Sequence, residues 1–112
     1  MAIEFEGKTI EMTDSGYLVN VEDWSEALAG QLAEKEGITL TEKHWDVINY
    51  LRDQYYNHAG NQPNERTILK DIGKQWGAKL SSKDMYDLFP LMPSKQGGRI
   101  AGLPESRRKG GY

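Results

Sequence analysis

The sequence predicts a mainly α fold of the α+β kind, a compact bundle of short helices with a small N-terminal β-hairpin. Three observations lead to this prediction. Apolar residues recur three and four positions apart from about residue 23 to residue 89, as they do on one face of a helix. The first twelve residues instead alternate apolar and polar around a glycine, which is typical of a hairpin. The 112 residues include no cysteine, so one core must hold the domain together without disulfides.

The hairpin is expected at the start of the chain, on either side of the turn Glu6-Gly7-Lys8. A second turn, Asp14-Ser15-Gly16, leads into a third short extended piece over residues 17–19. Because two strands alone are only marginally stable in water, we expect the hairpin to pack on the helices that follow.

Four helices are expected next, each with a capping residue before it and a stop after it. Asp23 caps the first, which runs to about residue 35 with Trp24, Ala27, Leu28 and Leu32 facing inward. The second helix covers residues 42–57 after the cap Thr41. The third begins after the cap Asn64, reaches Trp76 and stops at Gly77. The fourth covers residues 83–89 after Ser81 or Ser82 and stops at Pro90.

The pattern weakens beyond Pro93. Residues 94–100 have the length of a short helix, but the pair Gly97-Gly98 disfavours a stable one. Residues 104–112 are rich in charged residues and glycine and cannot bury enough apolar surface to order themselves. We therefore expect a helical domain with its hairpin over residues 1–103 and a flexible, basic C-terminal arm over residues 104–112.

Charge is distributed unevenly, although the net charge is only −3. Residues 1–36 hold nine acidic residues against two basic ones, whereas residues 94–112 hold five basic residues against one acidic one. An acidic front and a basic tail suggest either contact within the molecule or an acidic partner for the tail. A solvated tail that only keeps the protein soluble is the alternative.

Composition excludes several kinds of chemistry. Without cysteine there is no thiolate nucleophile, no Cys-ligated zinc and no iron–sulfur cluster. The two histidines, His44 and His58, lack a second histidine at ligand spacing, so we expect no metal and no cofactor. No apolar run has the length of a membrane span and the mean hydropathy is −0.72, which predicts a soluble, cytoplasmic protein without membrane contact.

One charged stripe stands out as a candidate binding surface. Arg66, Lys70 and Lys74 recur every four residues, which places them on one face of the third helix. The helix, turn and following helix also have the outline of a helix-turn-helix, but Asp84 and Asp87 on the second helix would repel phosphate, and the pI near 5.4 argues against DNA as well. A solvated face, a docking surface for an acidic protein and a nucleic-acid site all remain open, with nucleic acid the weakest.

The other residues that often carry chemistry favour structural roles here. Trp24, Trp45 and Trp76 each fall on an apolar helical face, where core packing is more common than base stacking. His44 follows a helix cap, and no serine or aspartate partner is placed beside it by spacing, so we expect a surface or capping histidine. From the residues alone, no catalytic set emerges.

The run Thr41-Glu42-Lys43-His44-Trp45-Asp46-Val47-Ile48-Asn49-Tyr50-Leu51-Arg52 resembles the DsrC/TusE family of sulfur-relay proteins. That family carries His-Trp-Asp-(Ile/Val)-Ile-Asn-aromatic-Leu-Arg on its second helix. The resemblance extends over nearly the whole chain, residues 3–104. It also includes the segments Pro63-Asn64-Glu65-Arg66, Tyr86-Asp87-Leu88-Phe89-Pro90, Lys95-Gln96 and Ile100-Ala101-Gly102-Leu103-Pro104, with Gly7-Lys8 and Gly16-Tyr17-Leu18 in the hairpin region.

This resemblance implies a bundle of short helices with an N-terminal hairpin and a mobile C-terminal arm. It also implies a role in sulfur metabolism, because family members receive sulfur as a persulfide on a thiol near the end of that arm. Members linked to dissimilatory sulfite reductase, as its gamma subunit, present the sulfur to that enzyme. The TusE members pass it on towards tRNA thiolation.

The chain departs from the family where this chemistry lies. The family pattern has a cysteine directly before the basic residue that opens the arm, where this chain has Gly98 before Arg99, and a penultimate cysteine, where this chain has Gly111. Persulfide transfer needs a thiolate, which glycine lacks. No residue here can therefore take over the family's catalytic role.

We accordingly predict a non-catalytic, regulatory DsrC/TusE-like protein, not an enzyme, that binds a protein partner of the sulfur-relay or sulfite reductase type. A DNA-binding regulator and a sulfurtransferase-relay component proper are the two alternatives. The residues predicted to contact the partner are the cations of the third helix and of the C-terminal region: Arg66, Lys70, Lys74, Lys95, Arg99, Arg107, Arg108 and Lys109.

Overall fold

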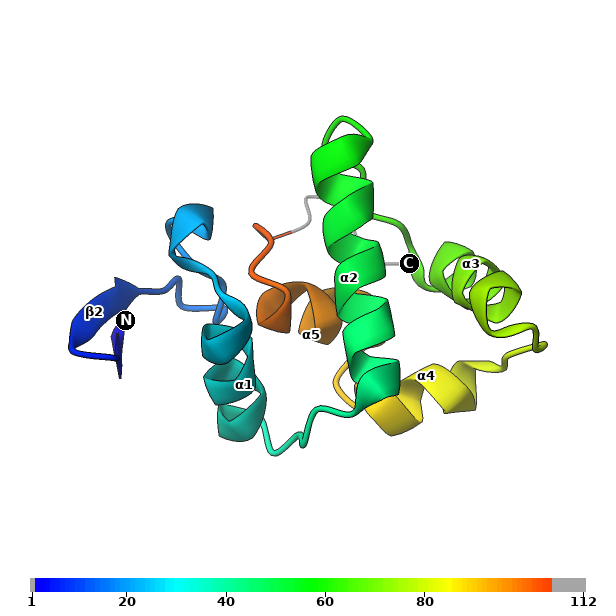
Figure 1. Cartoon of the computed structure of the whole chain (residues 1–112), viewed down its shortest axis with the longest axis horizontal. Coiled ribbons are helices and arrows are strands. Elements are labelled where there is room, and N and C mark those ends of the chain that lie inside the picture. The colour runs from blue at the N-terminus through cyan, green and yellow to red at the C-terminus, as the bar shows by residue number, and fades with distance from the viewer. Residues whose placement is uncertain (1, 106–112) are drawn as a thin grey trace.

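The fold opens on a two-stranded antiparallel sheet, as the alternating pattern predicts. In the computed structural model, which describes residues 2–105, β1 (Ala2–Phe5) pairs with β2 (Lys8–Glu11) and Ile3 lies opposite Ile10. Gly7 has a φ of +79°, so glycine suits this turn. The third extended piece is a single bridge between Met12 and Leu18. Figure 1 places the hairpin at one end of the molecule.

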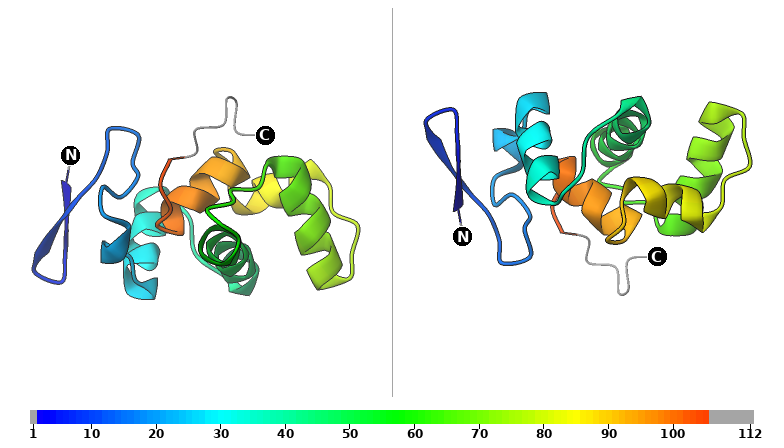
Figure 2. Two further views of the ribbon diagram at one scale, coloured as in Figure 1. Left: turned by 90° about the horizontal axis from the view of Figure 1, so that it is seen from above. Right: turned by 90° about the horizontal axis from the view of Figure 1, so that it is seen from below.

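A short 3₁₀ helix and five α-helices follow within the described part of the chain. The hairpin and α3 lie at opposite ends, and α5 lies between them beside α1 and α2 (Figures 1 and 2). The elements are η1 (Val21–Asp23), α1 (Glu26–Lys35), α2 (Glu42–Asn57), α3 (Glu65–Trp76), α4 (Ser82–Leu88) and α5 (Pro93–Ile100).

The caps of α2 and α3 are confirmed. Thr41 begins a capping box at α2, the Asn64 side chain accepts a hydrogen bond from the Thr67 amide, and Gly77 ends α3 in the left-handed conformation with a φ of 66°. At α4, Ser81 rather than Ser82 is the cap, because its backbone and hydroxyl both bond the Asp84 carboxylate three residues on.

The predicted start of the first helix was wrong. Ser25, not Asp23, caps α1 by accepting from the Leu28 amide at 3.1 Å, and Asp23 ends the separate helix η1. The intervening Trp24 is extended and therefore leaves the helical register, so that its indole is free to reach α5. Ala27, expected to face inward, is exposed.

The weak expectation for residues 94–100 was also wrong, because α5 is a regular helix despite Gly97 and Gly98. Pro93 occupies its first turn, where proline is well suited, and α5 contacts α1, α2, α3 and α4. At Gly97 an added Cβ would lie 3.0 Å from Leu51 Cδ1 of α2. The small residue thus allows close helix packing, and burial outweighs the poor helix propensity of glycine.

The two glycines of α5 give a matched prediction. Gly98→Ala should raise the free energy of unfolding by about 0.5–1 kcal/mol, because no atom lies within 4 Å of the new Cβ and alanine has the better helix propensity. Gly97→Ala should be about 1 kcal/mol less stable than Gly98→Ala, because its methyl presses on buried Leu51. Urea denaturation of both variants measures the difference, and equal stabilities would contradict this packing.

His44 is a capping histidine, as expected, but it is buried rather than on the surface. Its Nδ1 accepts from the Thr41 amide at 3.1 Å, so Nε2 carries the proton and donates to the Leu88 carbonyl at 2.9 Å. The side chain therefore fixes the start of α2 against the end of α4, and its ring meets the buried Phe89 ring edge-on. Burial lowers the pKa of His44 from its ordinary value of 6.5, opposed by the hydrogen bond to Leu88.

This pKa shift predicts a loss of stability in mild acid. Since the folded state disfavours protonation of His44, the unfolded state binds more protons as the pH falls below 6.5. The stabilisation from neutral His44 should be complete above pH 6.5 and should fall as the pH drops through the lower, folded-state pKa. Denaturation of wild type and His44→Gln on both sides of pH 6.5 tests this, and a difference between them that is independent of pH would refute it.

The core lies between the helices and one side of the hairpin. Trp45 and Trp76 are half-buried and pack against it, as predicted for core aromatics, and the Trp76 indole N–H donates to the Asp46 carboxylate at 2.8 Å. The fully buried apolar side chains include Leu28, Val47, Ile48, Ile68, Ile72, Met85, Phe89, Ile100 and Leu103.

Candidate functional site

Three side chains hold the backbone where it leaves α5. Each donates one hydrogen bond to a backbone carbonyl in residues 100–104. The donors come from three distant parts of the chain: Trp24 Nε1 to Ile100 at 2.8 Å, Arg52 Nη1 to Ala101 at 2.7 Å and Gln62 Nε2 to Pro104 at 2.8 Å. The start of the C-terminal segment is thus fixed against the domain.

Arg52 and Trp24 also pack on each other. The guanidinium of Arg52 lies 3.8 Å from the centre of the Trp24 ring and 4.9 Å from that of Tyr56. Gly102 lies against the same indole, with a φ of +73°, and an added Cβ would come within 2.2 Å of Trp24 Cδ1. Only glycine therefore fits between this ring and the turn after α5.

Sequence reasoning missed this arrangement. Trp24, Arg52 and Gln62 were not singled out as functional, because their partners lie 76, 49 and 42 residues away. Spacing along a helix reports neighbours three or four residues apart and carries no signal for such contacts. Residues 106–112 lie outside the described residues, so the flexible arm and the predicted partner residues Arg107, Arg108 and Lys109, together with Gly111, stay predictions.

Gly98 lies in the middle of α5, one turn before this exit. It is buried, and its carbonyl accepts from the Leu103 amide at 3.0 Å. Apart from its own helix backbone, no atom lies within 4 Å of the position of an added Cβ. The position at which the resemblance implies a thiol thus has room for a side chain.

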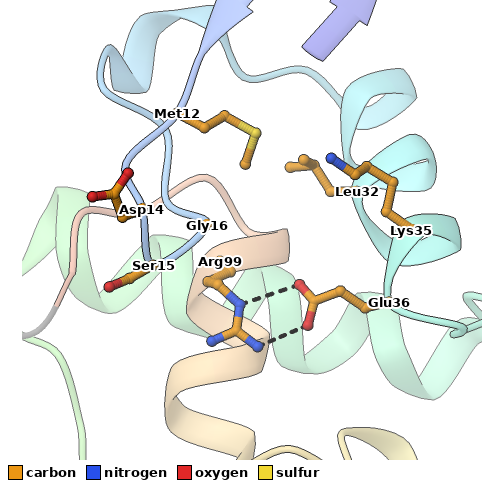
Figure 3. A pocket seen from close by; sticks show the side chains of 8 residues that line it. All are labelled: Met12, Asp14, Ser15, Gly16, Leu32, Lys35, Glu36 and Arg99. Carbon is orange, nitrogen blue, oxygen red and sulfur yellow. Dashed lines mark hydrogen bonds and ion pairs between the residues drawn. The ribbon is translucent and has the colours of Figure 1, made fainter. Parts of the chain in front are cut away.

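Arg99 faces α1. Its Nε and Nη2 donate to Glu36 at 3.2 and 2.7 Å (Figure 3). The amide of buried Gln96 donates to the same carboxylate at 2.9 Å. The hydrogen bond with Glu36 raises the pKa of Arg99, with burial opposing it. The pair forms one side of a hollow of about 400 Å³ that the turn Asp14-Ser15-Gly16 borders on another side. The Arg99 guanidinium is thus engaged within the domain.

The cationic stripe of α3 is present as predicted. Arg66, Lys70 and Lys74 are all exposed, and the stripe borders two hollows, of about 540 Å³ around Arg66 and about 510 Å³ around the two lysines. Lys95 is half-buried in the first turn of α5, next to Ser94, whose amide donates to Glu65 at the start of α3. The structure therefore brings Arg66, Lys70 and Lys74 together on α3 and places Arg99 elsewhere.

The second helix of the helix-turn-helix-like pair carries little free positive charge. In α4, Lys83 Nζ lies 3.0 Å from Asp87, and Asp84 caps the helix. A helix that presents two carboxylates and one paired lysine is poorly suited to a phosphate-lined groove. DNA binding stays a prediction without structural support.

Residues 2–105 contain no group of three His, Asp or Glu side chains placed to hold a metal. Within the same residues, no helix is long and apolar enough to cross a membrane.

Comparison with known proteins explains the arrangement of helices. The family model described as "DsrC like protein" matches residues 4–108. The chain belongs to the DsrC-like family. The resemblance drawn from the motifs is confirmed, and so are the helical bundle and the N-terminal hairpin that it implied.

Several DsrC-like relatives cover almost the whole chain. "Sulfurtransferase TusE" of Yersinia pestis is 47% identical over 104 residues, covering 92% of this chain and 94% of its own, and that of Escherichia coli K12 is 43% identical over 102 residues, covering 90% and 93%. Among solved structures, DsrC of Allochromatium vinosum aligns with a TM-score of 0.85 at 40% identity. The oxidized gamma-subunit of the dissimilatory sulfite reductase from Archaeoglobus fulgidus aligns with a TM-score of 0.87 at 34% identity, and each alignment covers 96% of this chain and 98% of the other.

Proposed function

We propose that this DsrC-like chain works in a sulfur relay by binding a protein partner of the relay or of a sulfite reductase, without carrying sulfur itself. The observation that carries the proposal is a family scaffold that contains no cysteine in 112 residues, with Gly98 at the position of a family thiol. A persulfide needs a thiolate to hold the sulfane sulfur. What the scaffold retains without a thiol is its shape and its charged surface.

The fixed exit of the C-terminal segment supports this role. Trp24, Arg52 and Gln62 hold the backbone of residues 100–104 in a defined place on the domain. In the proposed role, the chain occupies the docking surface of the partner and so regulates access by a cysteine-bearing relative. Arg66, Lys70 and Lys74, with the basic residues Arg107–Lys109, are the side chains that we propose for this contact.

A second candidate is a relay component in the full sense, which promotes sulfur transfer. The observation that favours it is the name "Sulfurtransferase TusE" of relatives that are 43–47% identical to this chain. Since the chain has no thiol, its contribution would be to bring two partners together. The acceptor's thiolate then attacks the outer sulfur of the donor's persulfide, the donor's S–S bond breaks, and the donor's thiolate is released as the acceptor becomes the persulfide.

One experiment separates the two candidates. Transfer of labelled sulfur from a persulfide-loaded relay partner to a cysteine-bearing DsrC/TusE relative is measured with increasing amounts of this chain. A binding competitor slows the transfer, whereas a relay component proper accelerates it. An unrelated protein of similar net charge serves as the control, and a transfer rate that the chain leaves unchanged would reject both candidates.

Intact-mass measurement completes the test. After incubation with the persulfide donor alone, we expect the mass of this chain to stay unchanged, because no residue forms a persulfide. Added sulfur that is removed by a reductant would contradict the proposal.

A further inference from the structure

The cations of α3 form the rim of an apolar groove. The two hollows beside α3 share Leu69 as a lining residue, so together they follow one side of the helix. We call this surface the α3 groove. We call its apolar lining residues, Leu69, Gly73, Ala78 and Leu80, the floor, and its cations, Arg66, Lys70, Lys74 and Lys79, the rim. At the Arg66 end the lining is polar and includes Asn64, Glu65 and Ser82.

The groove depends on a close approach between α3 and the segment that follows it. An added Cβ at Gly73 would lie 2.8 Å from the Ala78 carbonyl oxygen, and the Ala78 amide donates to the Gly73 carbonyl at 2.9 Å. The chain after Gly77 therefore turns back onto α3 and forms the second wall. The groove is thus a fixed part of the fold rather than a gap between side chains.

The rim cations have no neutralising partner among residues 2–105. The side chains of Arg66, Lys70, Lys74 and Lys79 make neither a hydrogen bond nor an ion pair there, whereas Lys83 and Arg99 each pair with a carboxylate. The acidic side chains of α3 and α4 that lie nearest in sequence are already engaged. Glu65 bonds the Ser94 amide, Asp71 the Tyr50 hydroxyl, Asp84 the Ser81 amide and Asp87 the Lys83 ammonium.

We propose that the α3 groove binds an acidic, amphipathic segment of a protein partner, an inference that rests on the proposed function and specifies the chemistry of its partner. Carboxylates of the segment meet the rim cations, and its apolar side chains enter beside Leu69 and Leu80. A regular spacing of three or four residues between these apolar side chains matches a groove that runs along a helix. Charge complementarity sets the orientation and the rate of association, and apolar burial supplies the affinity.

A nucleic acid fits this surface less well than a protein segment. A phosphate backbone brings continuous negative charge and little apolar surface to fill the floor. The groove therefore favours a partner whose charges are separated by apolar side chains.

The test starts from a display library of random peptides selected on the full chain. We expect the enriched peptides to contain more Asp and Glu than the input, with apolar residues three or four positions apart. A selection without this enrichment would overturn the proposal.

One enriched peptide is then synthesised with a fluorescent label and titrated against four proteins. Lys70→Gln/Lys74→Gln should weaken its binding by roughly fivefold or more relative to wild type, because two charge pairs are lost. Lys8→Gln/Lys35→Gln changes the net charge equally, on the hairpin and α1, and should change the affinity less than about twofold. Ala78→Gln places a longer side chain in the floor and should also weaken binding with all charges kept.

Several outcomes would overturn the proposal: equal losses in the two charge variants, unchanged binding by Ala78→Gln, or displacement of the peptide by a DNA duplex at lower concentration than by unlabelled peptide. Salt-dependent self-association of the chain that Lys70→Gln/Lys74→Gln abolishes would identify a second copy as the occupant and overturn it too.

The sulfur-transfer assay separates this proposal from the proposed function. If the variant Lys70→Gln/Lys74→Gln slows sulfur transfer to the same extent as the wild type, the proposed role in the relay stands. The α3 groove is then not the surface that carries out this role.

Discussion

Replacing Gly102 with alanine is expected to lower the free energy of unfolding by about 3 kcal/mol. Two independent causes add. The φ of Gly102 is +73°, where a Cβ clashes with the following carbonyl, and the new Cβ would overlap the Trp24 side chain at 2.2–2.7 Å. The indole can retreat only by giving up its hydrogen bond to the Ile100 carbonyl.

A second left-handed glycine separates the two causes. Gly77 has a φ of +66° but no atom within 4 Å of an added Cβ. Gly77→Ala should therefore lose only the conformational part, about 1–2 kcal/mol. Thermal and urea denaturation of both variants measure the difference in their free energies of unfolding. A Gly102 variant as stable as the Gly77 variant would mean that Trp24 does not pack tightly against the turn after α5.

Removing the carboxylate of Glu36 is expected to lower the free energy of unfolding by about 2 kcal/mol. Glu36 accepts two hydrogen bonds from Arg99 and one from Gln96. The Glu36 and Arg99 side chains are only 20% and 17% exposed, and Gln96 is 1% exposed. Glu36→Ala therefore leaves a guanidinium and a buried amide of α5 without their acceptor, and α5 loses its polar link to α1.

A double-mutant cycle tests whether this loss belongs to the pair. Glu36→Ala/Arg99→Ala should destabilise less than the sum of the single variants, with a coupling energy of about 1–2 kcal/mol. The exposed pair of Lys83 and Asp87 is the control, since Asp87→Ala should lose less than about 0.5 kcal/mol. Strictly additive losses for Glu36 and Arg99 would show that the contact does not hold α5.

The spacing of residues along the sequence revealed one part of the candidate site and could not reveal the other. Arg66, Lys70 and Lys74 lie on one exposed face because α3 is regular, so a rule about neighbours four residues apart placed them correctly. The same rule could not show that Arg99, in an equally basic segment, is paired with Glu36 at the end of α1. Nor could it show that Ala78 and Leu80 fold back to give the cations an apolar floor.

The sequence by itself determined the hairpin, the bounds of α2 and α3 and, through ordered motifs, the family. Caps and periodic apolar residues act within one or two helical turns, so that information is complete in a short stretch of chain. Only the tertiary structure decided that Gly97 and Gly98 stand in a regular helix and that Trp24, Arg52 and Gln62 hold its exit. The physical reason is that burial against four helices supplies more free energy to α5 than the propensity of two glycines removes, and that burial depends on residues far away in sequence.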